Sequence, residues 1–254
     1  MVLFHYLLLI SLLLPSFKGD DRLGEYCNKE KNVTGGQKPS IDHVLEELVA
    51  KTPMNGFAVS SYGIGQLKIY GLGQCRGDVS TDDCSTCISD AAKQLPQLCA
   101  EQSDARIWFD YCFLRYSPDN FAGKLDTGFG IFYWNVENAT DPEAFEKTLG
   151  NLMDGVRAQA IQPKNRGLGK DKTKFTPFVT IYGLIQCTRD LPALQCAQCS
   201  ATAVSNYDNF CKYKKGCRVL YSSCYVRYEI YPFFFPLDSV QKVVGSSKKT
   251  IFYP

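Results

Sequence analysis

A five-cysteine spacing that occurs twice is the feature that most constrains this chain. It runs from Cys75 to Cys112 and again from Cys187 to Cys224, each time as C-x8-C-x2-C-x11-C-x12-C. All five positions share an offset of 112 residues. Other residues that obey it are Tyr70/Tyr182, Gly71/Gly183, Leu72/Leu184, Gln74/Gln186, Asp78/Asp190, Arg106/Arg218, Arg115/Arg227 and Tyr116/Tyr228. The period is too long for a stacked repeat, so the 254 residues are predicted to form two related domains.

The first residues indicate secretion. The apolar run from Leu7 to Leu14, ended by Pro15, has the length of a signal-peptide core and is too short to span a membrane. We expect a signal peptide over residues 1–19, with cleavage between residues 16 and 24. No second long apolar run follows. The mature chain is therefore expected to be secreted and extracellular, without a transmembrane segment.

The cysteines allow three interpretations. Two C-x2-C pairs could hold zinc, act as a redox motif, or form structural disulfides. Secretion argues against free thiolates, and both pairs lie within amphipathic helical patterns, whereas a redox motif is expected in a βαβ unit. The even number of 12 cysteines favours structural disulfides and no metal site. Spacing alone does not choose among the possible pairings.

Residues typical of catalysis are scarce. The chain has 2 histidines, of which His5 lies in the expected signal peptide and His43 on the polar side of a predicted helix. No G-x-S-x-G, H-E-x-x-H, P-loop or kinase motif is present. A net charge of +2 gives no electrostatic reason to expect a nucleic-acid partner. The sequence thus predicts a protein that is not an enzyme and has no cofactor.

The hydrophobic pattern predicts the same order of elements in both copies. Helices are expected at residues 39–51, with Ser40 as N-cap, from Ser80 onward, from Pro142 onward, and at residues 193–206. Strands are expected at residues 57–62, 66–72, 107–116, 129–134, 178–187 and 218–231, and a basic loop at residues 162–174. Helices and strands without βαβ alternation indicate an α+β fold with antiparallel sheets.

This cysteine pattern resembles that of the ginkbilobin-like, or stress-antifungal, domain of plants, over about residues 25–235. The tandem is similar to plant cysteine-rich repeat secretory proteins. The resemblance implies domains at 25–134 and 135–235. With the signal peptide expected at 1–19, this leaves a C-terminal tail at 236–254. Each domain would have an antiparallel sheet, two packed helices and three disulfides. It also implies an apoplastic protein that binds or signals in stress and defence, with two alternatives: a mannose-binding antifungal lectin, or a partner of receptor-like kinase ectodomains.

The family's disulfide pairing can be carried onto the matching cysteines. In the first copy it implies Cys27–Cys99, Cys75–Cys84 and Cys87–Cys112. The second copy has no cysteine where Cys27 stands in the first, but has Cys217 at the offset of Ala105. The pairs expected there are Cys187–Cys196, Cys199–Cys224 and a local Cys211–Cys217.

The resemblance also implies a sugar site, because the founding family member is similar to a mannose-binding lectin with three polar residues. These are an Asn after the first cysteine, an Arg six residues before the last, and a Glu five residues after it. In the first copy these positions hold Asn28, Arg106 and Ser117. Serine cannot supply the charged, bidentate acceptor of a glutamate, so the first-copy site is expected to be incomplete.

In the second copy the same positions hold Arg218, Glu229 and, by alignment, Asn135 after Trp134. Arginine donates in a fixed fork and glutamate accepts from sugar hydroxyls. The sequence thus predicts a mannose-type glycan site in the second copy, with an ion pair between Arg218 and Glu229 on the strand surface as the alternative.

Two N-glycosylation motifs fit the secreted interpretation. They are Asn32-Val-Thr and Asn138-Ala-Thr. Both asparagines are expected to lie on the surface and to carry glycans if the chain is secreted.

Overall fold

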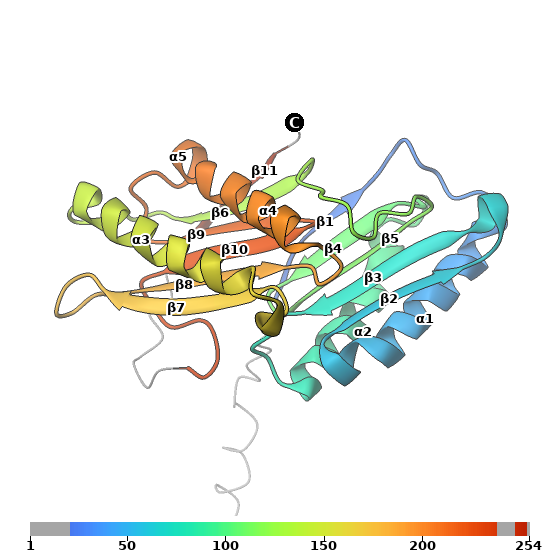
Figure 1. Cartoon of the computed structure of the whole chain (residues 1–254). Coiled ribbons are helices and arrows are strands. Elements are labelled where there is room, and N and C mark those ends of the chain that lie inside the picture. Colours follow the sequence, from blue (N-terminus) through green and yellow to red (C-terminus); the bar gives the residue numbers. More distant parts are fainter. Residues whose placement is uncertain (1–20, 238–246, 253–254) are drawn as a thin grey trace, which may run out of the picture.

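The computed structural model describes residues 21–237 and 247–252 (Figure 1). The signal peptide expected at residues 1–19 lies outside these residues. Within the two described ranges, no helix combines the length and apolar character needed to cross a membrane.

The first copy is a five-stranded antiparallel sheet with two helices on one face. The strand order is β1-β4-β5-β3-β2. Its elements are β1 (Arg22–Cys27), α1 (Gln37–Asn55), β2 (Phe57–Tyr62), η1 (Gly65–Leu67), β3 (Ile69–Cys75), α2 (Thr81–Leu98), β4 (Ala105–Phe109) and β5 (Cys112–Ser117). Val44 and Leu48 of α1 and Ile88 and Leu95 of α2 are completely buried against the sheet.

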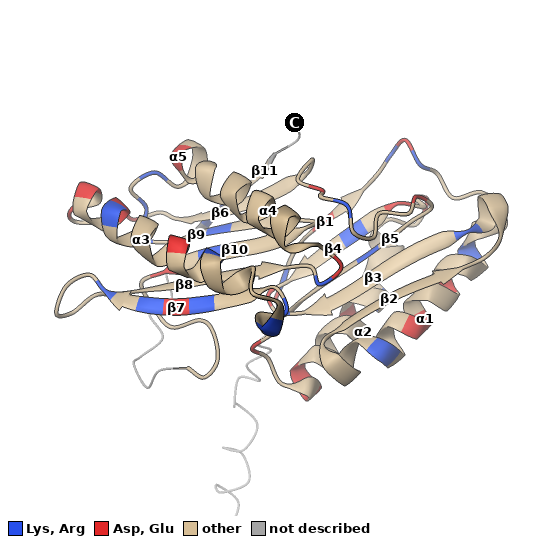
Figure 2. Cartoon of the chain, in the orientation of Figure 1, with Lys and Arg blue, Asp and Glu red and all other residues tan. Residues whose placement is uncertain are grey.

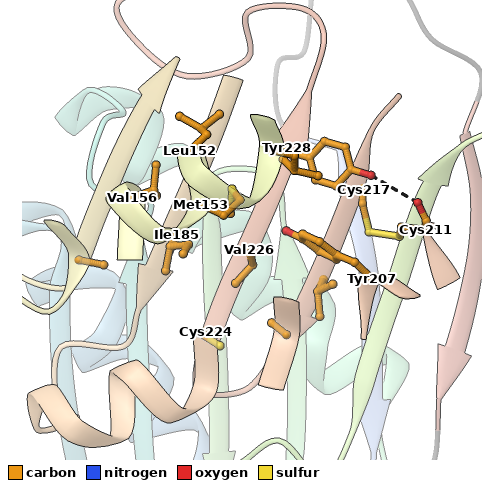
Figure 3. Packing of buried hydrophobic residues seen from close by; sticks show 14 of the residues in the cluster. Leu152, Met153, Val156, Ile185, Tyr207, Cys211, Cys217, Cys224, Val226 and Tyr228 are labelled. Atoms are coloured by element: carbon orange, nitrogen blue, oxygen red, sulfur yellow. Dashed lines mark hydrogen bonds between the residues drawn. A yellow bond between two sulfur atoms is a disulfide. The ribbon is translucent and has the colours of Figure 1, made fainter. Parts of the chain in front are cut away.

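The second copy repeats this plan with a six-stranded sheet in the order β11-β6-β9-β10-β8-β7. Its elements are β6 (Gly130–Asn135), α3 (Pro142–Ala160), η2 (Pro163–Asn165), β7 (Leu168–Lys174), β8 (Thr180–Cys187), α4 (Ala193–Ser205), α5 (Tyr207–Phe210), β9 (Cys217–Tyr221), β10 (Cys224–Glu229) and β11 (Ser247–Phe252). Its core lies between α3, α4 and the sheet, where the buried Tyr228 donates a hydrogen bond to the Cys211 carbonyl (Figure 3). The predicted α+β fold with antiparallel sheets is confirmed.

Helix boundaries follow from local chemistry. The Oγ atom of Ser80 accepts a hydrogen bond from the Asp83 amide at 3.1 Å, and Asp141 caps α3 in the same way through Ala144, with Pro142 in the first turn. The N-cap predicted at Ser40 is wrong. Helix α1 begins three residues earlier, at Gln37, and Ser40 is buried inside it.

Several strand predictions also change. Each of the long strands predicted at residues 107–116 and 218–231 is two antiparallel strands joined by a tight turn. The basic loop predicted at residues 162–174 contains edge strand β7. Lysines along β7 oppose pairing of this edge with another strand (Figure 2). The strand also packs closely on α3, because an added Cβ at Gly169 would lie 2.0 Å from the Val156 carbonyl. Charge on an exposed edge hid the strand pattern.

The domain limits of residues 25–134 and 135–235 remain an expectation, which the sheet membership of β6 refines. This strand pairs with β9 of the second sheet, so we place the boundary before Gly130. The residues expected to form a C-terminal tail, 236–254, contain β11, which pairs with β6 from Ser247 to Phe252. Lysines in β11 give it a polar sequence without a strand signal.

Six disulfides join strands to helices or to the residue directly after a helix. The pairs in the structure are Cys27–Cys99, Cys75–Cys84, Cys87–Cys112, Cys187–Cys196, Cys199–Cys224 and Cys211–Cys217. They coincide with the six pairs expected from the sequence, including the local Cys211–Cys217 pair of the second copy. The departure in the second copy has a geometric reason: Trp134 occupies the strand position of Cys27, because Cys27 pairs with Ala105 and Trp134 with Cys217. The sixth cysteine therefore lies on the neighbouring strand.

The two copies pack together with approximate two-fold symmetry, their helices on opposite sides of the molecule (Figure 1). Gln74 accepts a hydrogen bond from the Arg189 amide at 2.9 Å, and its repeat partner Gln186 accepts one from the Gly77 amide at 2.9 Å. Trp108 adds a bond from its indole nitrogen to the Tyr221 carbonyl, at 3.1 Å. Residues at equivalent repeat positions thus meet the opposite copy.

A charge cluster of largely buried side chains lies at this interface. One carboxylate oxygen of Asp110, from the first copy, lies 3.3 Å from Arg218 and 3.4 Å from Arg227 of the second, and 3.6 Å from Arg76. Tyr225 donates a hydrogen bond to the same oxygen at 3.2 Å. Burial raises the pKa of Asp110, but the three arginines lower it by more, so the pKa stays well below its usual range. Asp110 therefore stays ionised and connects the copies.

We expect the first copy to depend on its N-terminal disulfide. Cys27–Cys99 spans 72 residues and Cys211–Cys217 only 6. In the chain-entropy model, closing these loops adds about 4 and about 2 kcal/mol, respectively, to the free energy of unfolding. Replacing both cysteines of the first pair by alanine should lower the free energy of unfolding by about 2 kcal/mol more than replacing both of the second. Equal losses in chemical denaturation would contradict this.

The substitution Asp110→Asn should strongly destabilise the protein, because it leaves three arginines around an uncharged group. We expect a loss of about 3 kcal/mol in denaturant unfolding at pH 7. Asp119→Asn is the control, because the pair of Asp119 with Lys31 is exposed and contributes little.

The stability that Asp110 contributes is present above its unfolded-state pKa of about 3.9 and is lost as the pH falls through the lower folded-state value. Wild type should therefore lose stability more steeply than Asp110→Asn below about pH 4. A loss in the Asn variant no larger than in the control, or parallel acid profiles, would show that the cluster does not hold the interface.

Candidate functional site

Three neighbouring strands bring Asn135, Arg218 and Glu229 into one cavity. The Asn135 amide donates to the Gly216 carbonyl at 2.9 Å, just before β9, and the preceding Tyr133 pairs with Arg218. Strand β10 runs along the other side of β9, and ends at Glu229. The cavity has a volume of about 200 Å³ and contains all three side chains in its lining.

The cavity is shared between the copies. Its further lining residues are Asp21, Leu23 and Asp110 from the first copy and Tyr133, Trp134, Gly216 and Tyr231 from the second. The Leu23 carbonyl accepts hydrogen bonds from the Tyr133 hydroxyl and, at 2.8 Å, from Lys249 of β11. Strands β1, β6 and β11 therefore position one wall of the cavity.

Glu229 supplies the carboxylate. It is 7% exposed, and its Oε1 atom accepts a hydrogen bond from Arg227 Nε at 3.1 Å. Burial raises the pKa of Glu229, and Arg227 and Arg218 oppose this shift without cancelling it. An added Cβ at Gly216 would lie 1.9 Å from Glu229 Oε2, so only glycine leaves room for this carboxylate.

Arg218 and Asn135 supply donors. The Arg218 side chain is 13% exposed and is paired with Asp110. The Asn135 Oδ1 atom accepts from the Glu137 amide at 2.9 Å, while its Nδ2 has no hydrogen-bond partner among the described residues. The surface ion pair between Arg218 and Glu229 is not found, because Arg227 and Asp110 pair with these residues instead. Two donors facing one acceptor suit the hydroxyl groups of a neutral sugar.

In the first copy the corresponding donor groups are bonded to other residues of the protein. Arg106 donates to Ser222 at 2.7 Å and pairs with Asp126 at 2.9 Å. Asn28 donates to Asp104 Oδ2 at 3.0 Å. Ser117 is 2% exposed. These contacts support the expectation that the first copy lacks an open sugar site.

An exchange of acidic positions explains the difference between the copies. At the shared offset, Asp104 corresponds to Gly216 and Ser117 to Glu229. The carboxylate has thus moved from one strand position to another, and in the second copy glycine leaves the space open. Comparison of the repeats could have revealed this exchange. The roles of Asp110, Tyr133 and Tyr231 have no such signal, because they arise where strands or copies meet.

Both glycosylation motifs lie on exposed backbone at equivalent places. Asn32 forms an isolated bridge with Gln102, and Asn138 forms one with Lys214. Both asparagines are exposed, so both stay predicted glycan sites. Within the described part of the chain, no cluster of metal-binding side chains is present.

Comparison with known proteins agrees with this architecture. The model of the salt stress response/antifungal family matches residues 26–119 and 134–231. The chain is 56% identical to Cysteine-rich repeat secretory protein 55 of Arabidopsis thaliana, over 91% of this chain and 90% of the relative. It is 38% identical to the Antimicrobial ginkbilobin-2-like protein of Castanea crenata, over 89% and 94%.

The fold is also similar to a solved structure. The tandem DUF26 ectodomain of the Arabidopsis thaliana cysteine-rich receptor-like protein PDLP8 matches with a TM-score of 0.72 and 25% identity, over 82% of this chain and 97% of the ectodomain. Three findings lead to one conclusion. The family model matches twice along the chain, a relative is 56% identical over 90% of its length, and the tandem fold is shared. The chain belongs to the salt stress response/antifungal family and carries its domain twice.

Proposed function

We propose that this chain is a secreted, non-enzymatic binding protein of plant stress and defence responses, and that its second copy binds a mannose-type sugar. The observation that carries the proposal is the convergence of Asn135, Arg218 and Glu229 in one cavity. The names of its relatives, a secretory repeat protein and an antimicrobial protein, support an extracellular location in the apoplast and a defence role.

The size and polarity of the cavity favour a single sugar ring. Its volume of about 200 Å³ lies below the roughly 300–1,000 Å³ of sites for drug-sized ligands. Arg218 and Asn135 would donate to sugar oxygens and Glu229 would accept from hydroxyls. Tyr133, Trp134 and Tyr231 add aromatic surface to the same lining. Preorganisation supports binding, because Arg227 and Asp110 already hold the two charged groups in place.

A signalling role as a partner of receptor-like kinase ectodomains is the second candidate. The chain is 36% identical to Cysteine-rich receptor-like protein kinase 25 and 31% identical to kinase 26 of Arabidopsis thaliana. It matches 25% and 34% of their lengths. This second candidate would be favoured if the protein bound a purified kinase ectodomain and bound no sugar.

The variant Glu229→Gln tests the sugar site. We expect mannose to bind the oxidised wild-type protein in calorimetric titration, and the variant to bind about 10- to 100-fold more weakly because a charged acceptor is lost. Glu137→Gln is the matched control, since Glu137 is exposed and does not line the cavity. A wild-type protein that fails to bind mannose, or equal affinity in both variants, would refute the proposal.

The affinity for mannose should also depend on pH. Because the pKa of Glu229 is raised, the carboxylate becomes protonated at a higher pH than an ordinary glutamate, whose pKa is about 4.3. Affinity should therefore begin to fall on acidification at a pH above that value. In Glu229→Gln the residual binding should not change over this pH range. An identical pH profile in the two proteins would show that Glu229 is not the acceptor.

A further inference from the structure

A second cavity in the same copy has the opposite electrostatic character. It has a volume of about 290 Å³ and lies where the turn before β7, the segment after β8 and the first turn of α4 meet. Arg166 and Arg189 both line it, and none of its lining residues is acidic. Figure 2 shows the basic turn beside the end of β8. This cavity shares no lining residue with the sugar cavity.

The two arginines lack an anionic partner. Arg189 Nη1 donates to the Asn55 carbonyl at the end of α1, but its Nε atom is buried without a hydrogen bond. The side chain of Arg166 is exposed and has no hydrogen-bond or ion-pair partner among the described residues. Burial lowers the pKa of Arg189, and the nearby charge of Arg166 lowers it further. Two positive charges that line one cavity repel each other, and a bound anion would offset this repulsion.

The first turn of α4 adds further positive potential. Its N-cap is Pro192, which forms no side-chain cap, and the first turn has no acidic residue. Ala193, the first residue of the helix, lines the cavity. The N–H groups at a helix N-terminus carry a partial positive charge and bind phosphate, sulfate or carboxylate.

The first copy provides an internal comparison. Arg76 stands where the second copy has the lining residue Thr188, but Arg76 is paired with Asp78 at 2.6 Å. Three other positions differ as follows. Gly77 stands where the second copy has Arg189, and Asp82 where it has Leu194. The helix cap Ser80 corresponds to Pro192. The first two differences make the second-copy site more positive, and the third leaves the first turn of α4 without a side-chain cap.

A backbone hydrogen bond that occurs in both copies shows which first-copy residue corresponds to Arg166. The Cys75 amide donates to the Gly56 carbonyl, and the Cys187 amide donates to the Gly167 carbonyl, both at 2.9 Å. Asn55, before Gly56, therefore corresponds to Arg166, before Gly167. The nearby Asp190 is not part of the lining, and its carboxylate accepts from the Gly123 amide at 2.7 Å and forms no ion pair with either arginine.

We propose that Arg166, Arg189 and the first turn of α4 form an oxyanion-binding site for a phosphate, sulfate or carboxylate group on a molecule of sugar size. The arginine forks would bind the oxyanion by charge-assisted hydrogen bonds. The helix amides would bind the remaining oxygens. Because the cavity is larger than one inorganic ion needs, an acidic sugar is the favoured ligand class.

The experiment compares glucose 6-phosphate, glucuronate, inorganic sulfate and neutral glucose by titration at constant ionic strength. Wild-type protein should bind the phosphate and carboxylate sugars more tightly than glucose. Tighter binding than inorganic sulfate would identify the sugar ring as part of the ligand. Arg166→Gln should weaken binding of the acidic sugars by about tenfold or more, because one charged donor is lost. Lys164→Gln, which removes a neighbouring exposed charge outside the lining, should bind as wild type does.

The variant Leu194→Asp separates loss of binding from loss of folding. Leu194 is 71% exposed, and aspartate there restores the acidic first turn of the first copy. The variant should have a higher melting temperature without ligand, because the negative charge favours the helix N-terminus. Its affinity for the acidic sugars should nevertheless be lower. Equal affinity of wild type and Arg166→Gln, binding of glucose as tight as that of glucuronate, or unchanged affinity in Leu194→Asp would overturn the proposal.

Discussion

The ion cluster around Asp110 is the interaction on which the arrangement of the two copies depends. One carboxylate from the first copy lies among two arginines of the second and Arg76 of its own. A buried charge is costly unless it is paired, and separation of the copies would leave Arg218 without its carboxylate partner and Asp110 with Arg76 alone. The same carboxylate holds Arg218 at the wall of the cavity that contains Asn135 and Glu229. Interface and candidate site are therefore one electrostatic unit.

The duplicated scaffold is used asymmetrically. Arg106 and Arg218 occupy equivalent positions and both reach across the interface, but one meets Ser222 and the other Asp110. In the first copy a loop residue, Asp126, supplies the missing negative charge and closes the site. In the second copy Gly216 leaves space for Glu229, and a cavity remains. Small changes at equivalent positions thus separate a filled site from an open one.

Much of this architecture could be predicted from the sequence. The cysteine spacing predicted the duplication, and the helical spacing of apolar residues predicted α1 and α2. The aligned polar positions predicted three side chains that the fold brings into one cavity. Edge strands β7 and β11 could not be predicted, because lysines on exposed edges remove the apolar alternation of a strand. Asp110 could not be assigned a role either. Its partners are distant in sequence and meet it only when the two sheets pack.

The central claim is that the open cavity of the second copy, shared with Asp110, binds a neutral sugar. Backbone amide shifts of the isotopically labelled protein during titration with mannose test it most directly. Saturable changes are expected at Asn135, Gly216, Arg218 and Glu229, together with Asp110 across the interface. Saturable changes centred on Asn28 and Arg106 of the first copy, or no changes near Glu229, would contradict it.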